Sequence, residues 1–124
     1  MAGLRIPAHA HHSFAAEFDA SKPIMLTGRV TSVEWANPHI FIYIDVEDEE
    51  TGAVENWALE LGGPNSLMRL GWRRDSLKSG DLITVDGSLA RDGSNLANAR
   101  TIVMLATGRR MFAGSSGPPG EQEP

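Results

Sequence analysis

The chain has 124 residues, a formal net charge of −5 and no cysteine. This length allows one domain with a single modest core. The absence of cysteine excludes disulfides, thiolate nucleophiles and cysteine-ligated zinc sites, and the acidic charge argues against nucleic acid as a partner, because phosphate binding depends on lysine and arginine.

The first ten residues end in a pattern typical of a signal peptidase cleavage site. Ala8-His9-Ala10 has the small-x-small arrangement, although the usual apolar stretch of about 7–15 residues does not precede it. Two interpretations stay open. Residues 1–10 are the remnant of a targeting segment or a disordered end, and the protein is periplasmic or secreted; or the pattern is a coincidence and the protein is cytoplasmic. We favour export. No apolar run approaches the roughly 18 residues of a membrane-spanning helix, so no membrane span is expected.

A long strand is predicted from Lys22 onward, in a run rich in β-branched residues. Its apolar side chains change face along the way, because Leu26 and Val30 share one parity whereas Val33 has the other. A glycine or a bulge that bends a long strand produces such a change. We therefore expect the opening strand to bend near Gly28.

The clearest pattern in the sequence is the alternation that follows "NPH". Four β-branched residues lie on one face of this strand, and four polar or aromatic residues lie on the other. The first set is Ile40, Ile42, Ile44 and Val46, and the second is His39, Phe41, Tyr43 and Asp45. "EETG" predicts a hairpin turn, and residues 53–62 form the return strand, with Trp57, Leu59 and Leu61 expected in the core.

A short helix is predicted from Pro64 to Gly71, because proline is favoured in the first turn of a helix and glycine at its C-terminal cap. Two further strands are expected over residues 82–89 and 96–108, joined by a polar hairpin at residues 92–93. The residues expected on the buried side of the helix are Leu67, Met68 and Leu70.

Five strands with one short helix between the third and fourth are typical of the OB-fold, a small Greek-key barrel. A bent first strand can pair with both halves of such a barrel and so remove an exposed edge. A half-open sandwich with the same pattern is the alternative. We expect an all-β domain over residues 11–112 that includes an N-terminal arm. Residues 113–124, which are mostly Gly, Pro, Ser and Glu, should form a disordered tail.

Several motifs together resemble a family of small exported bacterial proteins classed as a domain of unknown function. They are "HHSFAAEFD", "VEWANPH", "NWALELGGPNSLMRLGW", "LKSGD" and "ARDGS", and the similarity runs from His11 to about Gly108. In that family the HHSF stretch typically follows a signal-peptide cleavage site. The resemblance thus implies export and a β-barrel, and it implies no activity.

Histidines and carboxylates suggest a metal site. OB-folds usually bind along the face of strands two and three, where Glu60 lies on the same side as His39. If the N-terminal arm folds over this face, His11 and His12 join them, together with the nearby carboxylates of residues 17 and 19. Imidazoles with carboxylates suit Zn(II) or Cu(II), and export favours copper. Cleavage after residue 10 would add the amine of His11. Alternatively, His39 is a turn residue bonded to a backbone carbonyl, and the terminal pair is solvated.

A second hypothesis is a module that binds a small molecule or a protein partner through the aromatic face of strands two and three. The residues expected to contact the ligand are Phe41, Tyr43, Trp35 and the polar Asn56. The alternative is that Phe14 and Phe18 of the arm cover this face.

A third hypothesis is a lyase or isomerase in which His39 and a carboxylate, Glu60 or Asp45, exchange protons with the substrate. The sequence is not specific enough to name a reaction. "GSLARDGSN" lacks the lysine and spacing of a phosphate loop, so no nucleotide cofactor is expected.

Overall fold

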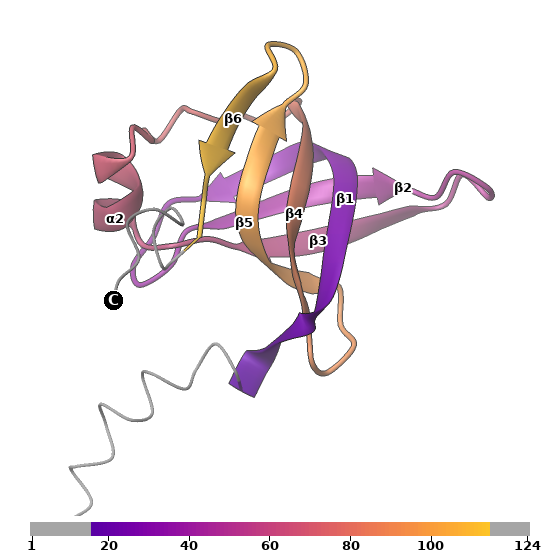
Figure 1. The fold of residues 1–124 in the computed structure, drawn as a ribbon. Helices are drawn as coiled ribbons and strands as arrows, with labels where there is room; N and C mark the ends of the chain where they lie inside the picture. The colour runs from indigo at the N-terminus through magenta and orange to yellow at the C-terminus, as the bar shows by residue number, and fades with distance from the viewer. Residues whose placement is uncertain (1–15, 115–124) are drawn as a thin grey trace, which may run out of the picture.

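The protein is seen in a computed structural model that describes residues 16–114 (Figure 1). These residues form six strands and a short helix. In chain order the elements are β1 (Phe18–Glu34), β2 (Phe41–Glu47), β3 (Val54–Glu60), α2 (Pro64–Arg69), β4 (Leu82–Ala90), β5 (Leu96–Met104) and β6 (Arg109–Phe112). No helix within the described range is long and apolar enough to cross a membrane.

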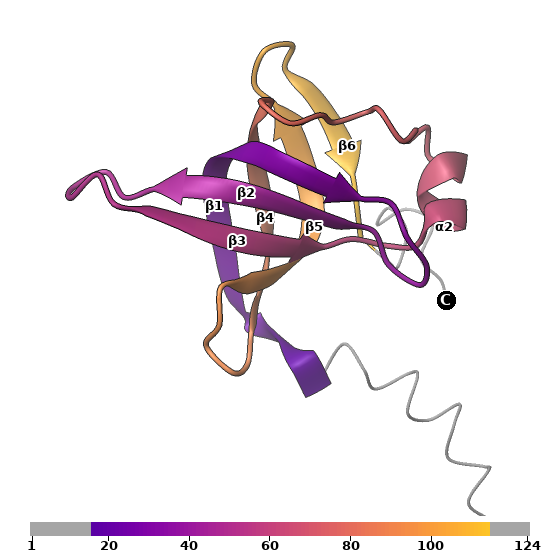
Figure 2. The ribbon, with the colours of Figure 1, turned by 180° about the vertical axis from the view of Figure 1, so that it is seen from behind.

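Five of the strands close into a ring. β1 pairs with β2 on one side and with β4 on the other, β2 continues to β3, and β4 continues to β5. A parallel pairing of β3 with β5, with Ala58 opposite Leu96 and Glu60 opposite Asn98, completes the ring. Figure 2 shows the β2–β3 side of this ring from behind. The predicted all-β, OB-like barrel with one helix between its third and fourth strands is confirmed.

The predicted bend in β1 is also present. The register between β1 and β2 shifts between Val30 and Ser32, which explains why inward-facing residues change parity along the strand. At Gly28 the neighbouring strand comes so close that a Cβ atom would lie 2.5 Å from the carbonyl oxygen of Asp45. Glycine is therefore required where β1 passes between its two partners. The strand begins at Phe18, four residues earlier than predicted.

The apolar core fills the ring, and α2 covers one end of it. Ile40, Ile42 and Ile44 are fully buried, as the alternation predicts. The expectation for the helix is only partly right. Leu67 is buried, but Met68 is exposed, because the short helix turns a single face, which also carries Pro64, toward the core. The remaining predicted core positions of this region divide in the same way: Leu59 and Leu61 are buried, whereas Trp57 and Leu70 are partly buried against the core.

A sixth strand was not predicted. The expected last strand over residues 96–108 instead ends at Met104, and the chain turns back as β6 beside β5. The end of β6 is tied to the segments that precede and follow α2, because the Gly62 amide donates a hydrogen bond to the Ala113 carbonyl (2.9 Å) and the Trp72 indole donates to the Phe112 carbonyl (2.9 Å). Ala113 is fully buried, so the packed domain extends past the predicted boundary at residue 112.

The close approach of β4 and β5 generates a stability prediction. A Cβ atom at Gly87 would lie 1.9 Å from the carbonyl oxygen of Asn98, which is backbone and cannot swing aside. Gly87→Ala should therefore lower the free energy of unfolding by about 1–3 kcal/mol, the usual cost of overpacking. Urea denaturation measures this change. Ser88→Ala, at the adjacent position, is the matched control, and equal midpoints for the two variants would contradict the prediction.

Candidate metal and proton site

His39 lies in the loop between β1 and β2 and is held by a backbone contact. Its Nδ1 lies 2.8 Å from the carbonyl oxygen of Leu61, just past the end of β3. Because a carbonyl oxygen only accepts hydrogen bonds, Nδ1 carries a hydrogen and donates it. This bond is the one that the turn interpretation anticipates. It also fixes the ring and leaves Nε2 as the atom available for chemistry.

Nε2 of His39 faces the carboxylate of Glu60, the last residue of β3. Nε2 and Oε2 are 3.4 Å apart, longer than the usual hydrogen-bond range of about 2.7–3.2 Å. The Glu60 side chain is only 13 % exposed, against 33 % for His39. With Nδ1 protonated, a neutral ring presents a lone pair at Nε2 to the oxygen lone pairs of the carboxylate. The pair therefore favours a positive species between its two atoms, either a proton or a metal ion.

Burial and charge set the protonation of Glu60. Desolvation raises the pKa of Glu60 above its ordinary value of 4.5, the charge of His39 lowers it in part, and the negative charge of Glu17 raises it further. Glu17 is held by the β4–β5 hairpin, because its carbonyl accepts a hydrogen bond from the amide of Arg91 (2.8 Å). The start of the described chain is thus close enough to Glu60 for the charge of Glu17 to act on its carboxylate.

The four predicted metal ligands divide into two groups. His39 and Glu60 are brought together, whereas His11 and His12 lie outside the described residues. Between residues 16 and 114, no group of three or more histidines and carboxylates has the arrangement of a metal site. Sequence reasoning did not identify the influence of Glu17 on Glu60, although it placed this carboxylate in the arm.

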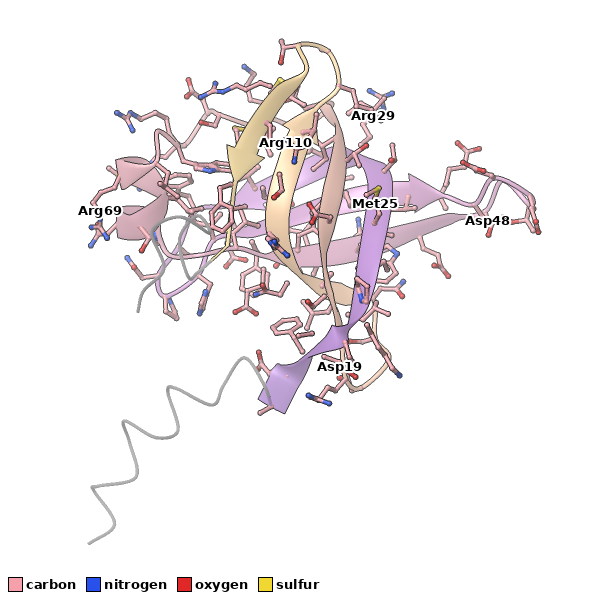
Figure 3. The ribbon with its side chains drawn as sticks, in the orientation of Figure 1. Asp19, Met25, Arg29, Asp48, Arg69 and Arg110 are labelled. Carbon is pink, nitrogen blue, oxygen red and sulfur yellow. The ribbon has the colours of Figure 1, made fainter. Side chains whose placement is uncertain are left out.

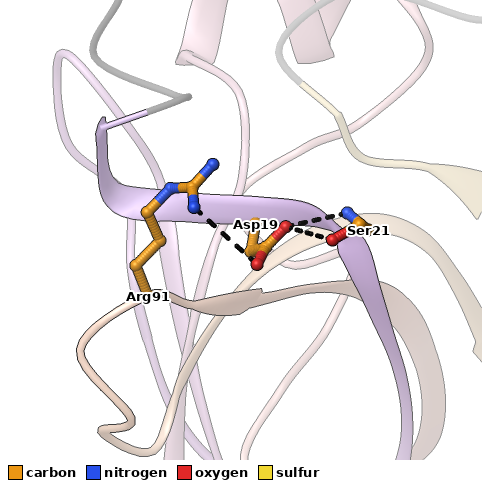
Figure 4. Close-up of polar contacts among 3 residues, drawn as sticks. All are labelled: Asp19, Ser21 and Arg91. Atoms are coloured by element: carbon orange, nitrogen blue, oxygen red, sulfur yellow. Dashed lines mark hydrogen bonds and ion pairs between the residues drawn. The ribbon is translucent and has the colours of Figure 1, made fainter.

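Asp19, the other carboxylate expected from the arm, has a local role instead. Its Oδ1 accepts hydrogen bonds from the backbone nitrogen (3.0 Å) and the hydroxyl (2.6 Å) of Ser21, and its Oδ2 lies 3.7 Å from Nη1 of Arg91 (Figure 4). The bonds from Ser21 hold the pKa of Asp19 below its ordinary value. This carboxylate shapes the start of β1 beside the β4–β5 hairpin.

The predicted aromatic face is only partly assembled. Phe41 and Tyr43 stack on the outer face of β2 with ring centroids 6.3 Å apart, and the Tyr43 hydroxyl donates to Glu34 (3.0 Å). Burial, followed by this bond and the charge of Glu34, raises the pKa of Tyr43. Trp35 lies elsewhere, because it packs against the core while the guanidinium of Arg74 lies 5.9 Å from its ring centroid.

Other side chains near this face are already engaged or lie outside the described range. The amide nitrogen of Asn56 donates to the Ile44 carbonyl (3.1 Å) and to Asp45 Oδ1 (2.9 Å). Asp45 is thereby tied to Asn56, so Glu60 is the carboxylate that accompanies His39. Phe18 is buried, but Phe14 lies outside the described residues, and the covering of the face by the arm stays a prediction.

Comparison with models of protein families assigns the sequence to a family. The model of a family of unknown function, DUF6152, matches residues 1–99. The chain belongs to the DUF6152 family. The expected resemblance to a family of unknown function is thereby confirmed, whereas the bacterial and exported origin stays a prediction. Within this DUF6152 protein the matched residues include all four histidines and Glu60 and end inside β5. The comparison with curated proteins found no match.

The raised pKa of Glu60 predicts how stability changes with pH. The native state binds the proton of Glu60 more tightly than the unfolded state does, so this contribution is complete below pH 4.5 and is lost as the pH rises through the native pKa. Glu60→Gln, which is always neutral, should therefore raise the thermal midpoint of the metal-free protein at pH 8 and have little effect at pH 4.

Thermal unfolding in the presence of a chelator, at both pH values, measures this difference. Glu55→Gln is the control, because Glu55 is an exposed carboxylate on the same strand. A Glu60→Gln variant that is less stable than the parent at pH 8, or equally shifted at both pH values, would count against the assignment.

Proposed function

We propose that this DUF6152 protein binds a divalent transition metal ion, Zn(II) or Cu(II), with His39 and Glu60 as two of its ligands. The observation that carries the proposal is that His39 Nε2 lies 3.4 Å from Glu60 Oε2 while His39 Nδ1 is hydrogen-bonded to a backbone carbonyl. Two ligand atoms at about 2.0–2.1 Å from a tetrahedral zinc ion lie about 3.3 Å apart. A carbonyl on the second ring nitrogen is the usual means of orienting a metal-binding histidine.

The imidazoles of His11 and His12 are the proposed further ligands. His12 precedes Glu17 by five residues, and an extended chain of this length spans at most about 18 Å. The charge of Glu17 acts on Glu60, so a chain of five or six residues is long enough for either histidine to approach the site. The carboxylates of Glu17 and Glu60 would balance the charge of a divalent ion, and neutral imidazoles supply the nitrogen donors that both metals accept.

Export to the periplasm or the cell exterior is part of the proposal. The support for it is the small-x-small pattern that ends at Ala10. Cleavage there would free the α-amine of His11, which with its own imidazole can chelate one ion. An oxidising compartment favours Cu(II) over Zn(II) for this donor set, and competition between the two metals distinguishes them.

Proton transfer by the same pair is the second candidate function. The fixed ring of His39 and the raised pKa of Glu60 suit general acid–base chemistry of the lyase or isomerase type. Here Glu60 would hold a proton that His39 Nε2 receives or returns. The two functions differ in their response to metal, because a chelator should abolish the first and leave the second intact.

Calorimetric titration of the full chain with Zn(II) and with Cu(II) tests the metal site. His39→Ala and Glu60→Gln should each weaken binding at least tenfold, since each removes one ligand, and replacing His11 and His12 together should do the same. His9→Ala is the matched control and should bind like the parent. Circular dichroism checks that the variants remain folded. A parent protein that gives no heat above dilution, or a His39→Ala variant that binds equally well, would overturn the proposal.

A further inference from the structure

We propose that the open end of the barrel, opposite α2, is a second binding site and that it takes an organic cation, an ammonium group attached to an apolar body. This site is independent of the metal site. It is built by the inner face of the β2–β3 hairpin together with β1, and Figure 1 shows this hairpin projecting from the end of the barrel that α2 leaves uncovered.

The inward-facing residues differ between the two ends of the barrel. Leu61 and Leu67, at the α2 end, are fully buried, as is Ile44 in the middle of β2. Leu26, Val46 and Trp57 also face inward but are only partly buried. These last three form the apolar floor of a cavity of about 350 Å³. A floor of this kind, left open at the mouth of a barrel, is a common place for a small ligand.

The hairpin holds the walls of the cavity in place. In the β2–β3 register Trp57 lies opposite Ile44 and Glu55 opposite Val46, so Glu55 and Trp57 share the inner face. The turn is fixed by Asp48, whose Oδ1 accepts hydrogen bonds from the amides of Glu50 (2.8 Å) and Thr51 (2.9 Å). Figure 3 shows Asp48 at this end of the molecule, far from α2. The walls therefore do not need to be ordered by a ligand.

The charge of the rim selects the ligand. Asp48 and Glu55 line the cavity, and the flanking residues Glu47, Glu49 and Glu50 add three more carboxylates without a lysine or arginine in residues 47–57. The hydrogen bonds from residues 50 and 51 keep the pKa of Asp48 low, so it stays ionised. In the described part of the chain the Glu55 side chain has no hydrogen bond or ion pair, and its charge is free to meet a cation.

The aromatic floor makes an organic cation a better occupant than a bare ion. The face of a tryptophan ring attracts ammonium groups, and Leu26 with Val46 offers apolar surface to the rest of the molecule. A metal ion would leave this surface unused, and no suitable group of three ligands is found among residues 16–114. An anion would meet only carboxylates at the rim. Apolar floor, aromatic ring and unpaired carboxylate together match an amine with an apolar body.

The test uses benzyltrimethylammonium as the probe, titrated into the full chain and followed by the Trp57 indole resonance in a ¹H–¹⁵N NMR spectrum. Trp57→Phe identifies this resonance among the three tryptophans. We expect a saturable shift of the Trp57 signal. Phenylacetate, which has the same ring and the opposite charge, should cause none.

Variants distinguish binding in this cavity from a general attraction between the acidic protein and a cation. Glu55→Gln should weaken binding of the probe by about two- to fivefold, the range expected for one partly exposed ion pair. Asp86→Asn, which removes a carboxylate from β4, is the matched control and should bind like the parent, as should His39→Ala. Equal shifts with phenylacetate, unchanged affinity in Glu55→Gln, or the absence of a saturable Trp57 shift would each overturn the proposal.

Discussion

The bend in β1 is the constraint on which the rest of the structure depends. One strand of 17 residues pairs with β4 along most of its length and with β2 near its end. Because the register of the strand shifts between Val30 and Ser32, just after the close approach at Gly28, its two pairings lie on different sides of the core, and β3 meets β5 to close the ring. A straight β1 would leave β3 as an exposed edge. The same closure brings Glu60 opposite Asn98 of β5, on the side of the barrel where the Glu17 carbonyl accepts a hydrogen bond from the Arg91 amide.

The closed ring also gives β3 two ends with different chemistry. At one end, Glu60 lies beside His39, under the influence of a second carboxylate and close to the covered end of the barrel. At the other end, Trp57 and Glu55 face an open cavity. The first end offers a nitrogen and an oxygen donor at a separation that suits a small cation, whereas the second offers a ring and apolar side chains that suit a larger one. In the two proposals, a single strand would therefore serve two kinds of cation that differ in size and hydration.

Local periodicity was sufficient to predict the barrel but not its sixth strand. The alternation from Ile40 to Val46 and the parity change between Val30 and Val33 report directly on which side chains face the core. The sixth strand was missed because its two arginines obscure a single buried residue, Met111, and because the turn after Met104 resembles the end of a strand. Four residues are too few for a periodic pattern to stand out.

The candidate site was predictable in part for similar reasons. That His39 and Glu60 lie on one face follows from strand parity, and the structure places them together. The engagement of Asn56 with Asp45 and the position of Trp35 against the core depend on contacts between distant segments, which parity does not report. The same holds for the influence of Glu17 on Glu60, because it arises where the arm crosses to the β4–β5 hairpin.

The attachment of β6 determines where an expressed fragment of a related sequence should end. The family match stops at residue 99, inside β5. A fragment cut there would lose the carbonyls of Phe112 and Ala113, and would leave the Trp72 indole and the Gly62 amide without acceptors beneath α2. The residues that match the family model and the residues that pack together in the domain therefore end at different positions in this protein. Expression of family members should retain the segment equivalent to residues 100–114, even where sequence similarity fades.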